Sequence, residues 1–383
     1  MQATEDRVEE IDLLRALAIT MVVVHHVGRG ILKGFVPDLL AEAWTGVDLF
    51  FVISGYLVTR SFAQWLERAG EEADFKLRAR LAWRYCLRRL CRILPPAWLW
   101  AALPLVAATV FNRSGAFGSP QEMFQAFRAV VFFNYNYFTV STGISQINHF
   151  WSLAVEEHYY IFLPFFLLLV SGTRSRIYGL LIIVIGCEVF RSLARRSGHQ
   201  FGEFLFLTHF RADALALGSL LGLLSNSILE WGKALNARKV FRVGAKSAAL
   251  LSICFLWTAP SFLTRDQVVY FGFSVFAVLS AFLVSLASLG RELIPFPKSL
   301  YGPIAAVGRR SYSLYLIHVP LIYLFRELRF RAFALPREIG WSSILPAAIE
   351  VGVYLIVLIV LTELNFRSIE YPLIKKVRTL FKE

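Results

Sequence analysis

Ionisable side chains interrupt an apolar stretch near the start of the sequence, residues 11–31, among them Asp12, Arg15, His25 and His26. The stretch is long enough to cross a bilayer, which takes about 20 residues. Ionisable groups in such a span usually face a polar cavity and serve function. Arg15 and His26 are 11 positions apart, which is about three helical turns, so both lie on one face about 16 Å apart along the axis. The spacing predicts a charged anchor and a proton acceptor at two depths of one cavity.

The neighbouring histidine, His25, is rotated by about 100° around the helix axis and falls off the face that Arg15 and His26 share. A neutral imidazole can accept a proton near neutral pH. The helical phase therefore selects His26 over His25 as the candidate base.

Carboxylates occur in two further apolar runs. Asp48 lies in the block GVDLFFVISGY, residues 46–56. An aspartate in a first helical turn also favours the helix dipole, so a structural and a functional role both stay open. Glu156 and Glu157 lie in residues 148–164 and point about 100° apart. They are therefore not expected to act as one carboxylate pair.

Another apolar run, residues 208–222, contains Arg211 and Asp213. An arginine inside a membrane needs a carboxylate partner, and Glu156 or Glu157 is the partner that we predict. A purely structural ion pair is the alternative role for this arginine.

A group of arginines, Arg88, Arg89 and Arg92, lies in the basic segment 83–96. Arg88 and Arg92 share a helix face. Guanidinium forks match phosphate oxygens, so the group is a candidate phosphate clamp, although basic residues also flank spans on the cytoplasmic side of ordinary membrane proteins. Pro95 and Pro96 are expected to stop or kink the helix that follows.

The late block 307–320 contains His318 with Tyr312 and Tyr315 one turn apart. The sequence does not decide whether His318 is a core histidine with one hydrogen bond or a site residue.

The composition predicts an all-α, polytopic membrane protein. Of the 383 residues, 57% are hydrophobic and 17% are charged, whereas soluble domains carry about 25% charged residues. The first apolar segment has no small-residue cleavage site after it, so we expect a retained span rather than a signal peptide. Ten spans are predicted, at about 11–31, 45–66, 93–111, 150–170, 177–193, 205–225, 244–263, 268–289, 304–325 and 341–365. Residues 129–138 are apolar but too short to span, and are expected to be re-entrant or interfacial.

The distribution of lysine and arginine predicts the orientation. With both termini in the cytoplasm, 24 of these residues fall in inner loops and 12 in outer loops, as the positive-inside rule requires. Residues 67–92 then form a basic cytoplasmic helix or helix pair, and 366–383 form a cytoplasmic tail of one domain, 1–383. The net charge of +13 is explained by these loops, with an anionic cofactor as a second cause. The sequence contains no zinc motif, glycine-rich nucleotide loop or G-x-S-x-G element.

Five blocks in a fixed order resemble the integral-membrane acyltransferase family 3, whose bacterial members O-acylate sugars. They are LLRALAITMVVVHH at 13–26, GVDLFFVISGY at 46–56, RRLCRILP at 88–95, WSLAVEEHYY at 151–160 and SYSLYLIHVPL at 311–321. The resemblance covers nearly the whole chain. His158 stands where the family commonly has glutamine, and His25 doubles the motif histidine.

The resemblance implies transfer of an acyl group, usually acetyl from acetyl-CoA, to a carbohydrate or glycolipid hydroxyl at the bacterial inner membrane, without a metal. It implies that the donor is bound by four arginines, Arg88, Arg89, Arg92 and Arg15, and that His26 is the general base. An acyl-histidine intermediate is a less favoured variant. We further expect Asp48 or Glu156 to orient the imidazole or the acceptor.

Some family members carry a fused extracytoplasmic esterase-like domain, for which this sequence is expected to have no room. The acceptor sugar, the choice of acetyl or succinyl and the oligomeric state are left open. The rival functions are a proton-coupled transporter and a partner of a polysaccharide-export system, neither of which requires a donor clamp.

Overall fold

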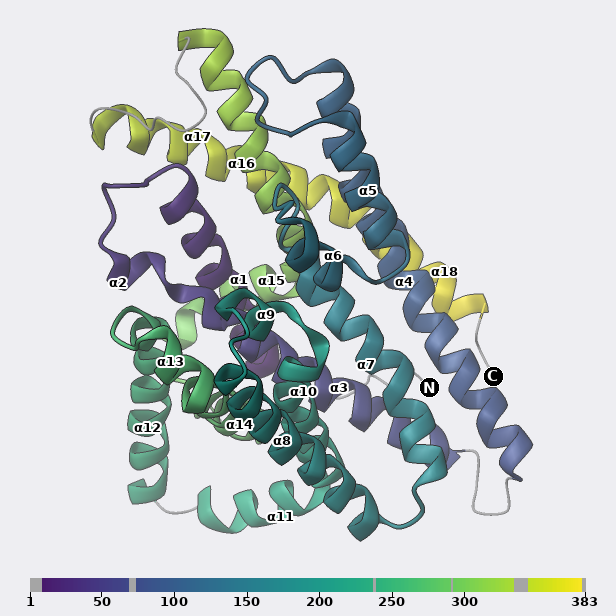
Figure 1. Cartoon of the computed structure of the whole chain (residues 1–383). Coiled ribbons are helices and arrows are strands. Elements are labelled where there is room, and N and C mark those ends of the chain that lie inside the picture. Colours follow the sequence, from purple (N-terminus) through teal and green to yellow (C-terminus); the bar gives the residue numbers. More distant parts are fainter. Residues whose placement is uncertain (1–8, 69–73, 237–238, 291, 334–343, 381–383) are drawn as a thin grey trace.

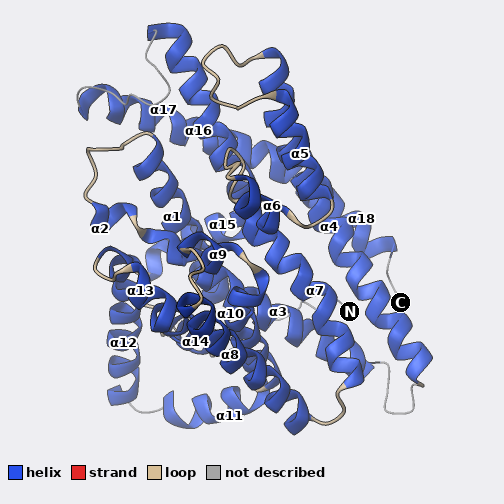
Figure 2. Ribbon diagram, in the orientation of Figure 1, coloured by secondary structure: helices blue, strands red, loops and turns tan. Residues whose placement is uncertain are grey.

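The computed structural model describes residues 9–68, 74–236, 239–290, 292–333 and 344–380. Within these ranges the secondary structure is entirely helical (Figure 2), which confirms the predicted all-α class. The α-helices are α1 (Glu9–Gly30), α2 (Asp38–Ala41), α3 (Gly46–Arg68), α4 (Phe75–Val110), α5 (Pro120–Val131), α6 (Tyr135–Thr142), α7 (Phe150–Leu169), α8 (Thr173–Arg196), α9 (Phe201–Phe206), α10 (Thr208–Leu223), α11 (Ser225–Asn236), α12 (Lys239–Thr258), α13 (Arg265–Gln267), α14 (Phe273–Ser288), α15 (Tyr301–Arg309), α16 (Ser311–Phe333), α17 (Ile344–Asn365) and α18 (Tyr371–Leu380).

Nine stretches of the described chain are long and apolar enough to cross a membrane. Of the ten predicted spans, 304–325 is not among these nine. Most of it lies in α16, which has 23 residues but carries many polar side chains. Helices α5 and α6 have 12 and 8 residues and are too short to span. This confirms the prediction that residues 129–138 do not cross the membrane.

Three predicted element boundaries differ from the structure. Helix α4 runs unbroken through Pro95 and Pro96, so these prolines do not stop it, and the basic segment joins the span as one 36-residue helix. The predicted span 304–325 is divided between α15 and α16 at Arg310, which pairs with Glu363 of α17. The predicted tail continues α17 as a short π-helix and α18, which packs on α4.

Helix α3 lies between two groups of helices (Figure 1): α1, α15, α16 and α17 on one side, and α8, α10, α12 and α14 on the other. It packs closely on α10 because glycines on each helix face the backbone of the other. A Cβ atom on Gly55 would lie 2.0 Å from the carbonyl oxygen of Leu215, and one on Gly218 would lie 2.1 Å from that of Val52. The expected close approach at Gly55 is confirmed, and it fixes α3 and α10 rigidly against each other.

Helix α15 packs on α1 through a similar contact at Gly308. A Cβ atom there would lie 1.8 Å from the carbonyl oxygen of Asp12, so Gly308→Ala forces the two backbones apart. Overpacking of this kind typically costs about 1–3 kcal/mol, and we expect a lower unfolding temperature in detergent. Gly302→Ala on the same helix is the matched control, because a Cβ atom at Gly302 meets nothing within 4 Å. Equal unfolding temperatures for the two variants would contradict this account of the contact.

Candidate active site

Helix α1 places Arg15 and His26 on one line, as the spacing predicts, and α16 brings a second histidine to His26. The Nε2 atom of His318 lies 3.3 Å from Nδ1 of His26. His149, which precedes α7, lies beside His318 with a distance of 5.3 Å between ring centroids. His149 and His318 are fully buried, whereas His26 keeps some exposure. A chain of imidazoles therefore leads from the protein interior to His26.

The hydrogen bonds around His318 assign its tautomer and that of His26. Nδ1 of His318 lies 2.7 Å from the carbonyl oxygen of Tyr315, which can only accept, so this nitrogen carries the proton of the neutral ring. Its Nε2 is then an acceptor for the N–H at Nδ1 of His26, which also lies 2.9 Å from the carbonyl oxygen of Val22. The assignment leaves Nε2 of His26 with a free lone pair, the form that a base requires.

The doubled histidine, His25, has a different environment. Its Nδ1 lies 2.6 Å from the carbonyl oxygen of Ala41 in α2. This bond ties α1 to the short helix α2. The geometry supports the choice of His26 made from helical phase.

Toward the other end of the same face of α1, positive charges gather around Arg15. The side chain of Arg15 is 30% exposed and lies 3.6 Å from Asp12. Arg92 is exposed and close enough to Arg15 and Arg89 for their charges to interact. Arg89 lies with its guanidinium carbon 3.7 Å from the ring centroid of Tyr160. The structure thus brings three of the four predicted donor-binding arginines together.

The fourth arginine, Arg88, points elsewhere. Its guanidinium carbon lies 5.8 Å from the ring centroid of Trp65 in α3, whereas Arg89 faces α7. Successive arginines on α4 therefore meet different helices, and the shared face of Arg88 and Arg92 does not bring both to one partner.

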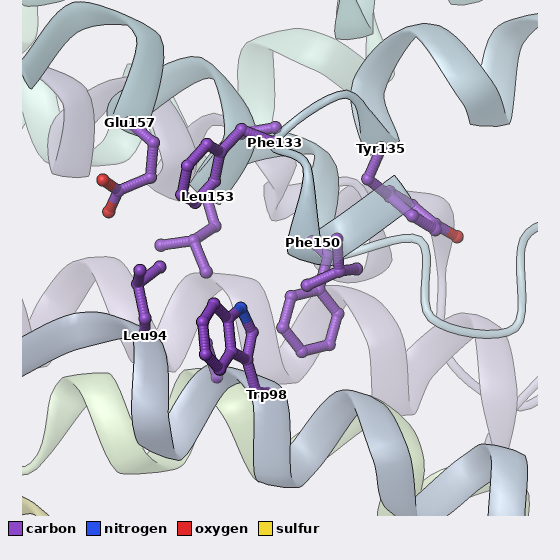
Figure 3. Close-up of a pocket in the computed structure, with 10 residues that line it drawn as sticks. Leu94, Trp98, Phe133, Tyr135, Phe150, Leu153 and Glu157 are labelled. Carbon is purple, nitrogen blue, oxygen red and sulfur yellow. The ribbon is translucent and has the colours of Figure 1, made fainter. Parts of the chain in front are cut away.

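The two glutamates of α7 diverge, as expected. Glu156 accepts a hydrogen bond from Tyr160 and lies within electrostatic range of Arg15 and Arg89. Glu157 is fully buried, and neither of its carboxylate oxygens has a hydrogen-bond partner in the described part of the chain. It lines a small apolar pocket with Leu94 and Trp98 of α4 (Figure 3). That cavity measures about 10 Å³, which is room for about one water molecule.

The predicted pairing of Arg211 with Glu156 or Glu157 is wrong. Its guanidinium donates to Asp48 over 2.7 Å, and both side chains are 1% exposed. Asp213 pairs instead with Arg191 of α8, over 2.8 Å. Helices α3, α8 and α10 meet at this point, so the nearest carboxylate to Arg211 comes from α3. In the structure Asp48 is therefore the ion-pair partner of Arg211. The hydrogen-bond partners of His26 are His318 and the carbonyl oxygen of Val22.

Sequence analysis did not identify two residues that lie near the arginines and histidines of the site. Glu370, in the predicted tail, is buried and accepts a hydrogen bond of 2.6 Å from Ser313 of α16. It lies within electrostatic range of Arg15 and Arg92, and no motif indicated it. His149 did have a signal, because it stands two residues before the tryptophan of the block 151–160.

No group of three or more metal-binding side chains is found among the described residues that could hold a metal ion. The polar groups are instead suited to an anion at the arginines and to proton transfer at the histidines. A bundle of apolar helices with such groups inside it defines a multi-pass membrane protein with a polar interior site.

Comparison with known families identifies the class. Residues 8–367 match the family described as the acyltransferase domain, and the chain belongs to this family. The match confirms the resemblance found in the five sequence blocks.

Two of its relatives are a peptidoglycan O-acetyltransferase, OatA, of Listeria monocytogenes and an O-acetyltransferase, OatA, of Staphylococcus aureus. The first is 28% identical over 96% of this chain and 56% of its own length, and the second is 27% identical over 96% and 57%. The chain thus spans about half the length of the curated relatives that it matches. Comparison with solved structures gives no match.

Proposed function

We propose that the chain transfers an acetyl group from acetyl-CoA to a hydroxyl group of a carbohydrate at the bacterial inner membrane. One observation carries the proposal: Arg15, Arg89 and Arg92 converge at one end of the face of α1 that holds His26 at the other. Three like charges in a partly buried space repel one another. Glu156 and Glu370 offset part of this repulsion, and a bound phosphate group would offset more.

The predicted orientation places the arginines toward the cytoplasm, where acetyl-CoA is made. The arginines hold the phosphates of the donor, and its extended arm covers the roughly 16 Å along α1 to the level of His26. The names of the relatives favour a glycan acceptor, with peptidoglycan as the first candidate.

At the reacting centre, Nε2 of His26 accepts the proton of the sugar hydroxyl as its oxygen attacks the thioester carbonyl. The C–O bond forms, the C–S bond breaks, and the imidazolium returns the proton to the departing thiolate. His318 acts as a positioning residue, because its Nε2 accepts from Nδ1–H of His26 and becomes a stronger partner when that ring is charged. General base catalysis of this kind is worth about 10²–10⁴-fold in rate.

Replacing Arg92 by glutamine tests the donor site. A hydrogen bond to a charged group contributes about 1.5–3 kcal/mol, so we expect the KM for acetyl-CoA to rise about 10–100-fold. The kcat should change little, because Arg92 lies near Arg15, which is about three helical turns from His26 on α1. The matched control is Arg84→Gln on the same helix, two turns toward its start.

The same preparation decides between an acyltransferase and a transporter. Acetyl-CoA should raise the unfolding temperature of the wild-type protein in detergent, and Arg92→Gln should reduce this shift. A wild-type protein whose unfolding temperature does not respond to acetyl-CoA would refute the proposed donor.

A further inference from the structure

A cleft of about 270 Å³ opens where α5 meets α6. We call it the α5–α6 cleft. It is lined by Gln125, Arg128, Ala129, Phe132, Asn134 and Phe138. In the predicted orientation it opens on the side of the membrane away from the cytoplasm, because α4 ends there.

The side chains of the α5–α6 cleft combine one exposed ring with several hydrogen-bonding groups. Phe132 is 71% exposed, and Gln125, Arg128 and Asn134 are exposed beside it. A sugar ring has an apolar C–H face that packs on an aromatic ring, and a rim of hydroxyls that accept from guanidinium and amide N–H groups. Three such polar groups are not expected on a surface that faces only lipid, because lipid chains offer them no hydrogen-bond partner.

The side chain of Asn134 does not make the hydrogen bond that is usual at its position, which supports a ligand role for the α5–α6 cleft. It occupies the N-cap position of α6, where asparagine normally accepts a hydrogen bond from the first turn of the helix. Its side chain makes no such cap. The amide is thus left facing the α5–α6 cleft at the expense of the helix end.

The turn between α5 and α6 has a strained backbone, and it directs Phe132 and Asn134 into the α5–α6 cleft. Phe133 has a φ of 59°, a left-handed conformation that is uncommon for a residue with a bulky side chain. Such strain persists where the surrounding structure over-determines it and clusters at functional sites. Phe133 lines the apolar pocket near Trp98 (Figure 3), while its neighbours Phe132 and Asn134 line the α5–α6 cleft.

A series of ring contacts connects the α5–α6 cleft with the histidines. Phe138 contacts Tyr135 with 5.9 Å between centroids, and Tyr135 contacts Phe150 at 6.5 Å. Phe150 contacts His149 at 4.4 Å, and His149 contacts His318 at 5.3 Å. The α5–α6 cleft is therefore several side chains away from His26. Sugar units bound at the two places would belong to one glycan of several units.

We propose that the α5–α6 cleft is a saccharide subsite, which holds a sugar unit of the acceptor several units along the glycan from the unit that is acetylated. The inference rests on the proposed function for the identity of the reacting unit, but saccharide binding can be measured without acetyl transfer. Such a subsite favours a glycan of several units over a single sugar.

The experiment measures calorimetric binding of the tetramer of β-linked N-acetylglucosamine to the purified chain, residues 1–383, in detergent and without acetyl-CoA. The tetramer should bind more tightly than the monomer. Phe132→Ala and Asn134→Ala should each weaken tetramer binding about tenfold, as expected for loss of a packed ring face or of hydrogen bonds.

Two variants on α5 serve as matched controls. Phe124 is 53% exposed but does not line the α5–α6 cleft, and Gln121 is exposed one turn before Gln125. Phe124→Ala and Gln121→Ala should leave tetramer binding unchanged. Equal affinities for Phe132→Ala and Phe124→Ala, or no binding of the tetramer to the wild type, would overturn the proposal and leave the face as a lipid-facing surface.

Hydrolysis of acetyl-CoA by the same proteins separates the two proposals. Intact hydrolysis in a protein that does not bind the tetramer refutes the subsite alone. Tetramer binding that depends on Phe132, in a protein that neither binds nor hydrolyses acetyl-CoA, refutes the proposed donor and supports the saccharide subsite. With both present, Phe132→Ala should raise the KM for the tetramer and leave kcat unchanged.

Discussion

Replacing His26 by alanine is expected to lower acetyl transfer by about 10²–10⁴-fold, the usual contribution of a general base. The hydrogen-bond network leaves Nε2 of His26 as the only ring nitrogen of the His26–His318 pair with a free lone pair. The measurement is kcat with acetyl-CoA and a glycan acceptor, alongside acetyl-CoA binding. Binding should persist in the variant, because the arginines lie about three turns away.

His25→Ala is the matched control, since it removes an adjacent imidazole of the same helix. It breaks the bond to Ala41 and should lower the unfolding temperature slightly, while kcat stays within a few-fold of the wild type. If His25→Ala abolishes transfer and His26→Ala does not, the assignment of the base is wrong.

The role of His318 can be separated from a purely structural one in the same assay. Glutamine at this position offers an amide oxygen that can still accept from Nδ1–H of His26, whereas leucine cannot. His318→Gln should therefore retain more kcat than His318→Leu, with similar KM values for the donor.

The sequence was sufficient for the features that depend on one helix. The line of Arg15 and His26, the divergence of Glu156 and Glu157 and the exclusion of residues 129–138 as a span follow from helical geometry and length. These three features do not depend on which helices lie next to one another, and the structure has all three of them.

The features that depend on neighbouring helices could not be derived in this way. Arg211 could reach a carboxylate from any adjacent helix, and only the packing of α3 on α10 through Gly55 selects Asp48. Glu370 looked like a residue of a solvated tail, but α18 folds back against α4 and buries it. The prolines of α4 were expected to stop or kink the helix, but it continues as one helix that packs on α5, α7 and α16.

Asp48 was predicted either to have a structural role or, like Glu156, to orient the imidazole or the acceptor, and its buried bond to Arg211 favours the structural role. Asp48→Ala leaves the guanidinium of Arg211 buried without its carboxylate, which typically costs about 3–5 kcal/mol. Arg211 also packs over the ring of Phe273, with its guanidinium carbon 4.2 Å from the centroid, and cannot easily move to water. Chemical unfolding in mixed micelles should show this loss of stability.

The double variant Asp48→Leu with Arg211→Met separates a structural role from a catalytic one. Replacing both members of a buried pair by apolar side chains is often neutral for stability, so most of the lost stability should return. If the pair only fixes α3 against α10, the double variant recovers kcat to within about tenfold of the wild type, because the catalytic histidines are unchanged and general base catalysis remains. A stable double variant whose kcat stays about 10²-fold or more below the wild type would instead give the Asp48–Arg211 pair a role in catalysis beyond holding α3 against α10.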